Sequence, residues 1–201
     1  MAGQGRFIAL EGGEGSGKST QAALLADRLD AVLTREPGGT SAGERIRALI
    51  LDPSLPPIDV RTETLLLLAA RAQHVTEVIR PALEAGRDVV CDRFDGSTLA
   101  YQGCGRGLEP AALAGLSTWA TGGLEPDLVL LLQVPLVEAR SRRAARSQPD
   151  RIEGEGAEFF ERVATGFAEL AARHPLRWRV LDGTGTVEAV AARVWLAAGR
   201  P

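Results

Sequence analysis

The segment GGEGSGKS holds the residues of this 201-residue chain with the clearest chemical potential, because Gly12, Gly17, Lys18 and Ser19 follow the spacing GxxxxGK[ST]. Glycines let the backbone bend so that successive N–H groups point at one phosphate, and the start of a following helix adds the positive end of its dipole. Lys18, the only lysine of the chain, can neutralise the β- and γ-phosphates of a nucleoside triphosphate, and the Ser19 hydroxyl can ligate Mg²⁺. The segment predicts a nucleoside triphosphate site.

A cluster of arginines lies far from this loop in the sequence, within residues 139–151. Arg142 and Arg146 are four residues apart and would share one face of a helix. Like charges crowded in this way repel one another unless an anion arrives, and phosphoryl transfer needs guanidinium groups on the transferring oxygens. We expect a mobile cationic lid over about residues 140–156; the alternative is a solvated basic face.

Three further arginines, Arg35, Arg71 and Arg93, are candidates for a second anion site. Arg35 and Arg93 lie at the ends of predicted strands, and in open α/β sheets the carboxyl ends of strands face the ligand crevice. Arg71 lies in a helical pattern beside an apolar run. Asp92, at the end of an apolar strand, is a candidate metal-organising carboxylate, although an aspartate there can also cap a loop.

Apolar runs and helical periodicities predict the elements that position these residues. Strands are predicted at 6–11, 31–34, 88–92, 127–134 and 177–182, and helices at 17–30, 41–52, 59–79, 95–103, 109–121, 135–146, 157–174 and 186–198. Strands that alternate with helices predict an α/β fold, in which a parallel five-stranded sheet carries helices on both faces. We expect residues 1–201 to form one domain of the P-loop NTPase type.

The composition argues against several classes of protein. A net charge of −3 and a pI near 5.5 are unlike a general nucleic-acid-binding protein. No stretch approaches the ~20 apolar residues that span a bilayer, and the first residues lack the pattern of a secretory signal. Cys91 and Cys104 lie outside any CxxC spacing, which favours a reducing cytoplasm over a zinc site or a disulfide framework. His74 and His174 are expected on helix surfaces.

Five segments, FIALEGGEGSGKST, TREPGGT, AARAQH, CDRFDGSTLAYQGCGRG and DRIE, resemble bacterial thymidylate kinases in sequence and order. The resemblance covers about residues 6–185. It implies that the γ-phosphoryl group of ATP is transferred to dTMP, giving dTDP and ADP for dTTP supply, with Mg²⁺ as cofactor. It also implies a homodimer, with long apolar-faced helices at 59–79 and 95–121 at its interface. Because the phosphate loop contains no arginine whereas the lid is rich in them, the chain resembles the subgroup whose lid supplies the catalytic cation.

The resemblance further implies a set of site residues. It assigns catalysis to Lys18, Arg93, Arg142 and Arg146, ATP binding to Gly12, Gly13, Glu14, Gly15, Ser16, Gly17, Lys18, Ser19 and Thr20, and metal binding to Ser19 and Asp92. It assigns dTMP binding to Glu14, Arg35, Pro37, Leu67, Arg71, Arg93, Thr98, Tyr101 and Gln102. Within this set, Arg35 and Arg93 should orient the acceptor phosphate, and Thr98 and Gln102 should meet the thymine edge.

The remaining implied roles concern the sugar and the face of the base. Glu14 should lie near the 3′-hydroxyl, Tyr101 should pack under the sugar, and the turn at Pro37 suits a cis peptide bond. Leu67 departs from the family, which commonly has phenylalanine at that position. A leucine loses the stacking of an aromatic ring, worth ~0.5–1.5 kcal/mol beyond its area.

Two other functions remain open at this stage. The chain could phosphorylate another monophosphate, such as dUMP, CMP or GMP. It could instead be a nucleotide switch or binding module without an acceptor, which would hydrolyse ATP slowly and show no stimulation by dTMP. The arginines of the second anion site and of the lid argue against the switch.

Overall fold

A computed structural model describes residues 4–144 and 150–199 of the chain. Its centre is a parallel sheet with the strand order β2-β3-β1-β4-β5. The strands are β1 (Phe7–Glu11), β2 (Val32–Arg35), β3 (Val89–Asp92), β4 (Leu128–Gln133) and β5 (Trp178–Asp182). Each predicted strand is present within one or two residues, and the predicted five-stranded parallel sheet is confirmed.

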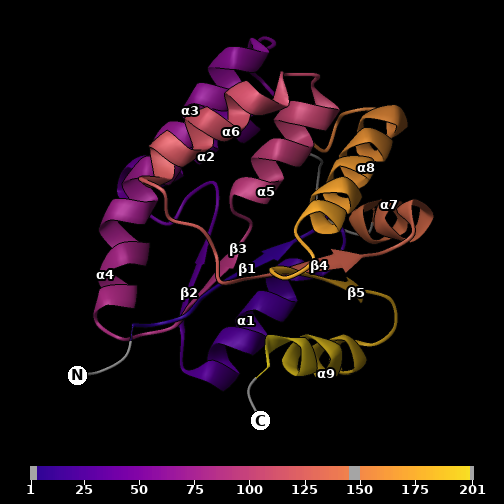
Figure 1. Ribbon diagram of the computed structural model, residues 1–201. Helices are drawn as coiled ribbons and strands as arrows, with labels where there is room; N and C mark the ends of the chain where they lie inside the picture. The colour runs from indigo at the N-terminus through magenta and orange to yellow at the C-terminus, as the bar shows by residue number, and fades with distance from the viewer. Residues whose placement is uncertain (1–3, 145–149, 200–201) are drawn as a thin grey trace.

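Helices connect the strands and cover both faces of the sheet, as predicted (Figure 1). They are α1 (Lys18–Leu29), α2 (Ser41–Leu51), α3 (Val60–His74), α4 (Arg80–Glu84), α5 (Asp95–Thr98), α6 (Pro110–Thr121), α7 (Leu136–Ala144), α8 (Ala157–Arg173) and α9 (Val187–Ala198). Two π-helical segments, η1 (Val75–Ile79) and η2 (Leu99–Gly105), continue α3 and α5.

The core is divided by the sheet into two apolar layers. Along β1, Ile8 and Leu10 face the helices α1 and α9, whereas Phe7 and Ala9 face the layer that contains α8 and the two π segments. Because parallel strands are buried on both faces, every residue of β1 is buried. Figure 1 shows α1 and α9 on one side of the sheet and α8, α5 and α6 on the other.

The π segments are the main departure from the predicted helices. The sequence predicts regular helices over 59–79 and 95–103, but the structure widens the turns at η1 and η2. An i→i+5 turn leaves no mark in a 3.6-residue apolar period, so the pattern could not reveal it. The second segment carries Tyr101 and Gln102, both predicted site residues and both buried.

None of the helices in residues 4–144 and 150–199 combines the length and the apolar character that crossing a bilayer requires.

Candidate active site

The predicted phosphate loop lies between the end of β1 and the first turn of α1. Gly12 and Gly17 have φ values of 148° and 87°, which residues with a side chain rarely adopt. A Cβ at Gly12 would also lie only 2.6 Å from the carbonyl oxygen of Leu132. No side chain caps the start of α1 at Gly17. The first N–H groups of α1 are therefore available to an anion, as the motif requires.

Lys18 begins α1 and is almost completely buried. Its Nζ lies 3.2 Å from the carbonyl oxygen of Gly13 and 3.9 Å from Glu14 Oε2. Burial and the neighbouring Arg93 guanidinium lower the pKa of Lys18, while Glu14 acts in the opposite direction. An ammonium group held in this way is poorly solvated, which strengthens its attraction to a phosphate oxygen.

A cavity of about 290 Å³ opens beside the phosphate loop at the carboxyl ends of β2 and β3. All the residues predicted to bind dTMP line it: Glu14, Arg35, Pro37, Leu67, Arg71, Arg93, Thr98, Tyr101 and Gln102. Lys18, Ser19 and Asp92 reach the same cavity from the phosphate loop and β3. The structure thus brings the predicted set together from four separate segments of the chain.

Arg93 lies directly after β3 and connects the phosphate loop to the cavity. Its guanidinium donates hydrogen bonds to the carbonyl of Gly12 (3.0 Å), to Ser97 Oγ (2.9 Å) and to Tyr101 Oη (3.1 Å), and it pairs with Glu14. Burial alone would lower the pKa of Arg93, but the Glu14 carboxylate and other nearby groups raise it, so the cation persists. Glu14 thereby draws Lys18 and Arg93 toward one point.

Glu11, at the end of β1, holds Arg93 in place through Ser97. Its Oε1 accepts hydrogen bonds from the backbone N–H groups of Phe94 and Ser97 (both 3.0 Å), and its Oε2 accepts one from the Ser97 hydroxyl (2.6 Å). Because Ser97 Oγ in turn accepts from Arg93, the carboxyl group fixes the side chain that orients the guanidinium. Burial raises the pKa of Glu11 to about 7.

Arg71 is buried, and a carboxylate that no local pattern in the sequence indicates holds it in place. Its Nε donates to Glu36 Oε2 (2.7 Å), and its Nη2 donates to the carbonyl of Phe94 (3.0 Å). Glu36 Oε1 lies 3.0 Å from His74 Nδ1, and His74 Nε2 lies 2.6 Å from Thr34 Oγ1. The expectation of a surface histidine at position 74 is wrong: His74 is fully buried, because this network satisfies both ring nitrogens.

The last residue of β2 and a residue of α2 supply two more cations to the cavity. Arg35 is half-exposed and pairs with Glu44 through Nη2 at 2.8–2.9 Å. The Glu36–Pro37 bond is cis, as the turn suggested. Arg47, which the sequence analysis missed, also lines the cavity and donates to the carbonyl of Pro37 (3.0 Å).

The inner end of the cavity combines apolar and polar groups. Leu67 lines it from α3, and Thr98 and Gln102 line it from α5 and η2. Glu63, a further residue missed from the sequence, accepts a hydrogen bond from Gln102 Nε2 at 2.8 Å. Its spacing was a usable signal, since positions 63, 67 and 71 lie four residues apart and share one face of α3.

The predicted lid residues are described only in part. Arg142, on α7, donates to the carbonyl of Gly183 (3.2 Å) and reaches the carbonyl of Gly15 (3.5 Å), so it lies beside the phosphate loop. Arg146 lies outside the described residues. Arg151 donates through Nε to the carbonyl of Ile50 (2.7 Å) and pairs with Glu63, and these contacts hold this part of the predicted lid segment against α2 and α3.

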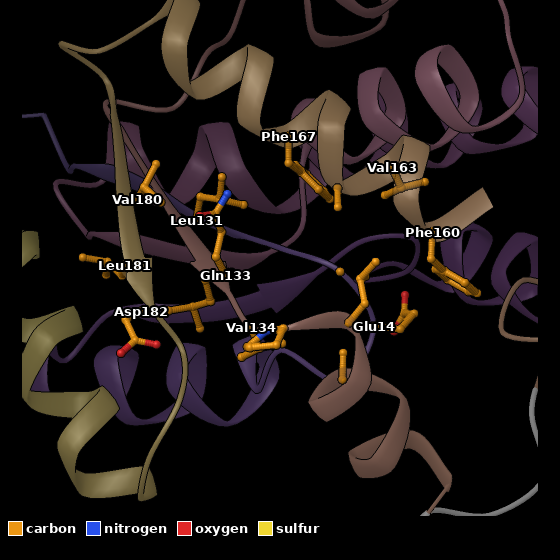
Figure 2. Close-up of a pocket in the computed structure, with 16 residues that line it drawn as sticks. Glu14, Leu131, Gln133, Val134, Phe160, Val163, Phe167, Val180, Leu181 and Asp182 are labelled. Atoms are coloured by element: carbon orange, nitrogen blue, oxygen red, sulfur yellow. The ribbon is translucent and has the colours of Figure 1, made fainter. Parts of the chain in front are cut away.

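A second cavity, of about 440 Å³, lies on the other side of Glu14. Figure 2 shows Phe160, Val163 and Phe167 of α8 facing Leu131 of β4 and Val180 of β5 across it. Glu14 and Gly13 are the only members of the predicted site that line it among the described residues. Its wall is mostly apolar, unlike the cation-rich wall of the first cavity.

The described residues offer a metal ion no site built from such side chains alone. No cluster of three or more histidine, cysteine, aspartate or glutamate side chains among them could hold an ion. Asp92 Oδ1, however, is buried without a hydrogen-bond partner at the edge of the first cavity. A buried carboxylate oxygen with a free lone pair suits a hard cation that is also bound by phosphate oxygens, and Ser19 at the start of α1 lines the same cavity.

Comparison with known proteins places this geometry in context. The family model described as "Thymidylate kinase" matches residues 10–194. The thymidylate kinase of Alkalilimnicola ehrlichii is 52% identical over 193 residues, covering 93% of this chain and 89% of that protein. That of Ectopseudomonas mendocina is 50% identical over 195 residues, covering 94% and 93%. The crystal structure of thymidylate kinase from Ehrlichia chaffeensis superposes with a TM-score of 0.80 at 32% identity, covering 98% of this chain and 99% of that one.

Proposed function

This chain belongs to the thymidylate kinase family, and from that premise we propose how its own residues carry out the family's reaction. That reaction transfers the γ-phosphoryl group of ATP to dTMP and gives dTDP and ADP. Residues 12–20 bind the triphosphate of ATP, and the cavity lined by Arg35, Arg71 and Arg93 binds dTMP. The observation that carries the assignment is the ion-pair bridge at Glu14, which joins Lys18 of the phosphate loop to Arg93 of the cavity.

The reaction depends on the placement of the two substrates more than on acid–base catalysis. A phosphate oxygen of dTMP is already anionic at neutral pH, so no strong base is required. Arg93 and Arg35 orient the acceptor phosphate, while Lys18 offsets charge on the transferring group. Arg93 is supported for this role by its four hydrogen-bond partners, which fix the guanidinium before a substrate arrives.

The sugar and the base of dTMP are assigned to the inner part of the cavity. The Tyr101 ring packs edge-on against Phe159 and Phe167, at centroid distances of 6.0 and 6.1 Å. A rigid ring at that place would crowd a 2′-hydroxyl and so favour deoxyribose. Thr98 and Gln102 supply polar groups for the edge of thymine, and Leu67 supplies an apolar contact for its face.

Mg²⁺ is the proposed cofactor, held by Ser19 and Asp92 together with ATP. The unpartnered Asp92 Oδ1 supports this assignment. When bound, the ion neutralises charge on phosphate oxygens.

We also propose that residues 140–156 act as a lid within a single domain. The guanidinium of Arg142, beside Gly15 and Gly183, supports a contact with the ATP side of the site. Together with Arg146, it would place positive charge on the transferring oxygens and exclude water when the lid closes.

We further propose that the protein is a homodimer in the cytoplasm, on the basis of its exposed apolar side chains and its free cysteines. Trp119 on α6 is 82% exposed, and the neighbouring α3 exposes Leu65, so a second copy would remove apolar surface from water (Figure 1). Cys91 and Cys104 are both free thiols, which suits a reducing compartment.

The decisive experiment is ADP release with ATP and Mg²⁺ against a panel of acceptors. We expect dTMP to stimulate ADP release far more than CMP or GMP, with dUMP second. Release of ADP that no monophosphate stimulates would favour the switch, and stimulation by another acceptor alone would favour a different kinase.

A further inference from the structure

Glu63 is a buried carboxylate that joins Gln102, which lines the first cavity, to Arg151 of the proposed lid. It lies on α3 and is 1% exposed. Its Oε1 accepts from Gln102 Nε2 (2.8 Å) and Arg106 Nε (3.2 Å), and its Oε2 accepts from Arg106 Nη2 (3.3 Å) and pairs with Arg151. Burial alone would raise the pKa of Glu63, but hydrogen bonds from Gln102, Arg151 and Arg106 lower it below its usual value.

An ionised carboxylate can only accept hydrogen bonds, which fixes the amide of Gln102. The –NH₂ group must face Glu63, since the carbonyl oxygen Oε1 could not bond there. Because Gln102 lines the cavity, its Oε1 is the atom of the amide left to meet a base. Thymine and uracil carry a donor at N3, whereas cytosine carries an acceptor at that position.

We propose that Glu63 is a positioning residue for base selection: it holds the Gln102 amide in the one orientation that accepts from the N3–H of thymine and rejects the N3 of cytosine. This inference rests on the proposed binding of dTMP in the first cavity. Arg71, whose donors point to Glu36 and Phe94, cannot take over this role, because a guanidinium only donates.

The isosteric variant Glu63→Gln tests the inference. A neutral amide at position 63 can pair with either orientation of Gln102, so the rejection of cytosine weakens. One mismatched hydrogen bond corresponds to about 5- to 100-fold; we expect the preference for dTMP over dCMP, as the ratio of the two kcat/KM values and of the two dissociation constants from competitive displacement, to fall about tenfold. Glu63→Asp keeps the charge but withdraws it from Gln102, and should lower the same ratio if Glu63→Gln does not fold.

Two matched variants separate positioning from general damage. Glu155→Gln removes the other carboxylate that pairs with Arg106 without touching Gln102, and should leave the dTMP-to-dCMP preference unchanged. Gln102→Met removes the amide, so adding Glu63→Gln to it should not change the preference further.

An unchanged preference in Glu63→Gln and Glu63→Asp, even with a lower melting temperature or kcat, would overturn the inference. So would an equal additional loss in the Gln102→Met background. Failure of the underlying assignment is distinguishable, because the unaltered protein would then show no dTMP-stimulated release of ADP.

Discussion

Replacing Glu36 by glutamine removes one charge from the interior while keeping the shape of the side chain. The Glu36 and Arg71 side chains are 5% and 3% exposed, and Arg71 Nε lies 2.7 Å from Glu36 Oε2. Two charges about 4 Å apart attract by about 4 kcal/mol at an effective dielectric constant of about 20. Part of this remains, because the amide oxygen of glutamine still accepts from Arg71, and Asp95 also attracts the guanidinium. We expect a loss of about 3 kcal/mol in the free energy of unfolding, as for other buried pairs that lose one partner.

Thermal unfolding measured by circular dichroism tests this value. A loss of about 3 kcal/mol corresponds to a fall in Tm of about 6–12 °C for a chain of this size. Glu44→Gln is the matched control: it makes the same chemical change in the half-exposed pair with Arg35 and should cost at most about 1 kcal/mol. Equal losses in the two variants would refute the reasoning that burial makes the Glu36–Arg71 pair costly to break.

Three other changes address the phosphate loop, the face of the base and the support of Arg93. Lys18→Ala should lower turnover by at least about 100-fold and leave dTMP binding nearly intact, since Lys18 is assigned to the phosphates of ATP and Arg93 and Arg35 to the phosphate of dTMP; an equal loss of dTMP binding in calorimetry would contradict its assigned role. Leu67→Phe should tighten dTMP binding about two- to tenfold, the equivalent of ~0.5–1.5 kcal/mol of stacking, and unchanged or weaker binding would count against it. Because the pKa of Glu11 is about 7 when folded and 4.5 when unperturbed, the folded state holds an extra proton between these values, and stability falls as the pH rises through that window. Glu11→Gln abolishes this dependence, so unfolding at pH 5 and pH 8 should show the variant gaining up to about 3 kcal/mol relative to the unaltered protein; a constant difference would show that Glu11 does not titrate there.

The parts of the fold and site that could be predicted are those that depend on local patterns in the sequence. The phosphate loop follows from glycine spacing between a strand and a helix, and Arg35 and Arg93 follow from their places at strand ends. Arg35 and Arg93 meet in one cavity because the parallel sheet brings the ends of β2 and β3 to one edge.

The groups that were missed are the partners that hold the predicted residues in place. Glu36 is 35 positions from Arg71, and Glu63 is 39 positions from Gln102, so neither pairing has a local signature. The surface assignment of His74 failed for the same reason, since its burial depends on Glu36 and Thr34 from another element. Buried charges are satisfied by tertiary contacts, which a single sequence does not display.

The most direct test of the two-site account is a crystal structure of the protein with dTMP and a non-hydrolysable ATP analogue. We predict that the triphosphate lies along residues 12–19 and that the phosphate of dTMP lies within hydrogen-bond distance of the Arg93 guanidinium, near Arg35. A dTMP molecule whose phosphate points out of the cavity, away from both arginines, would contradict it.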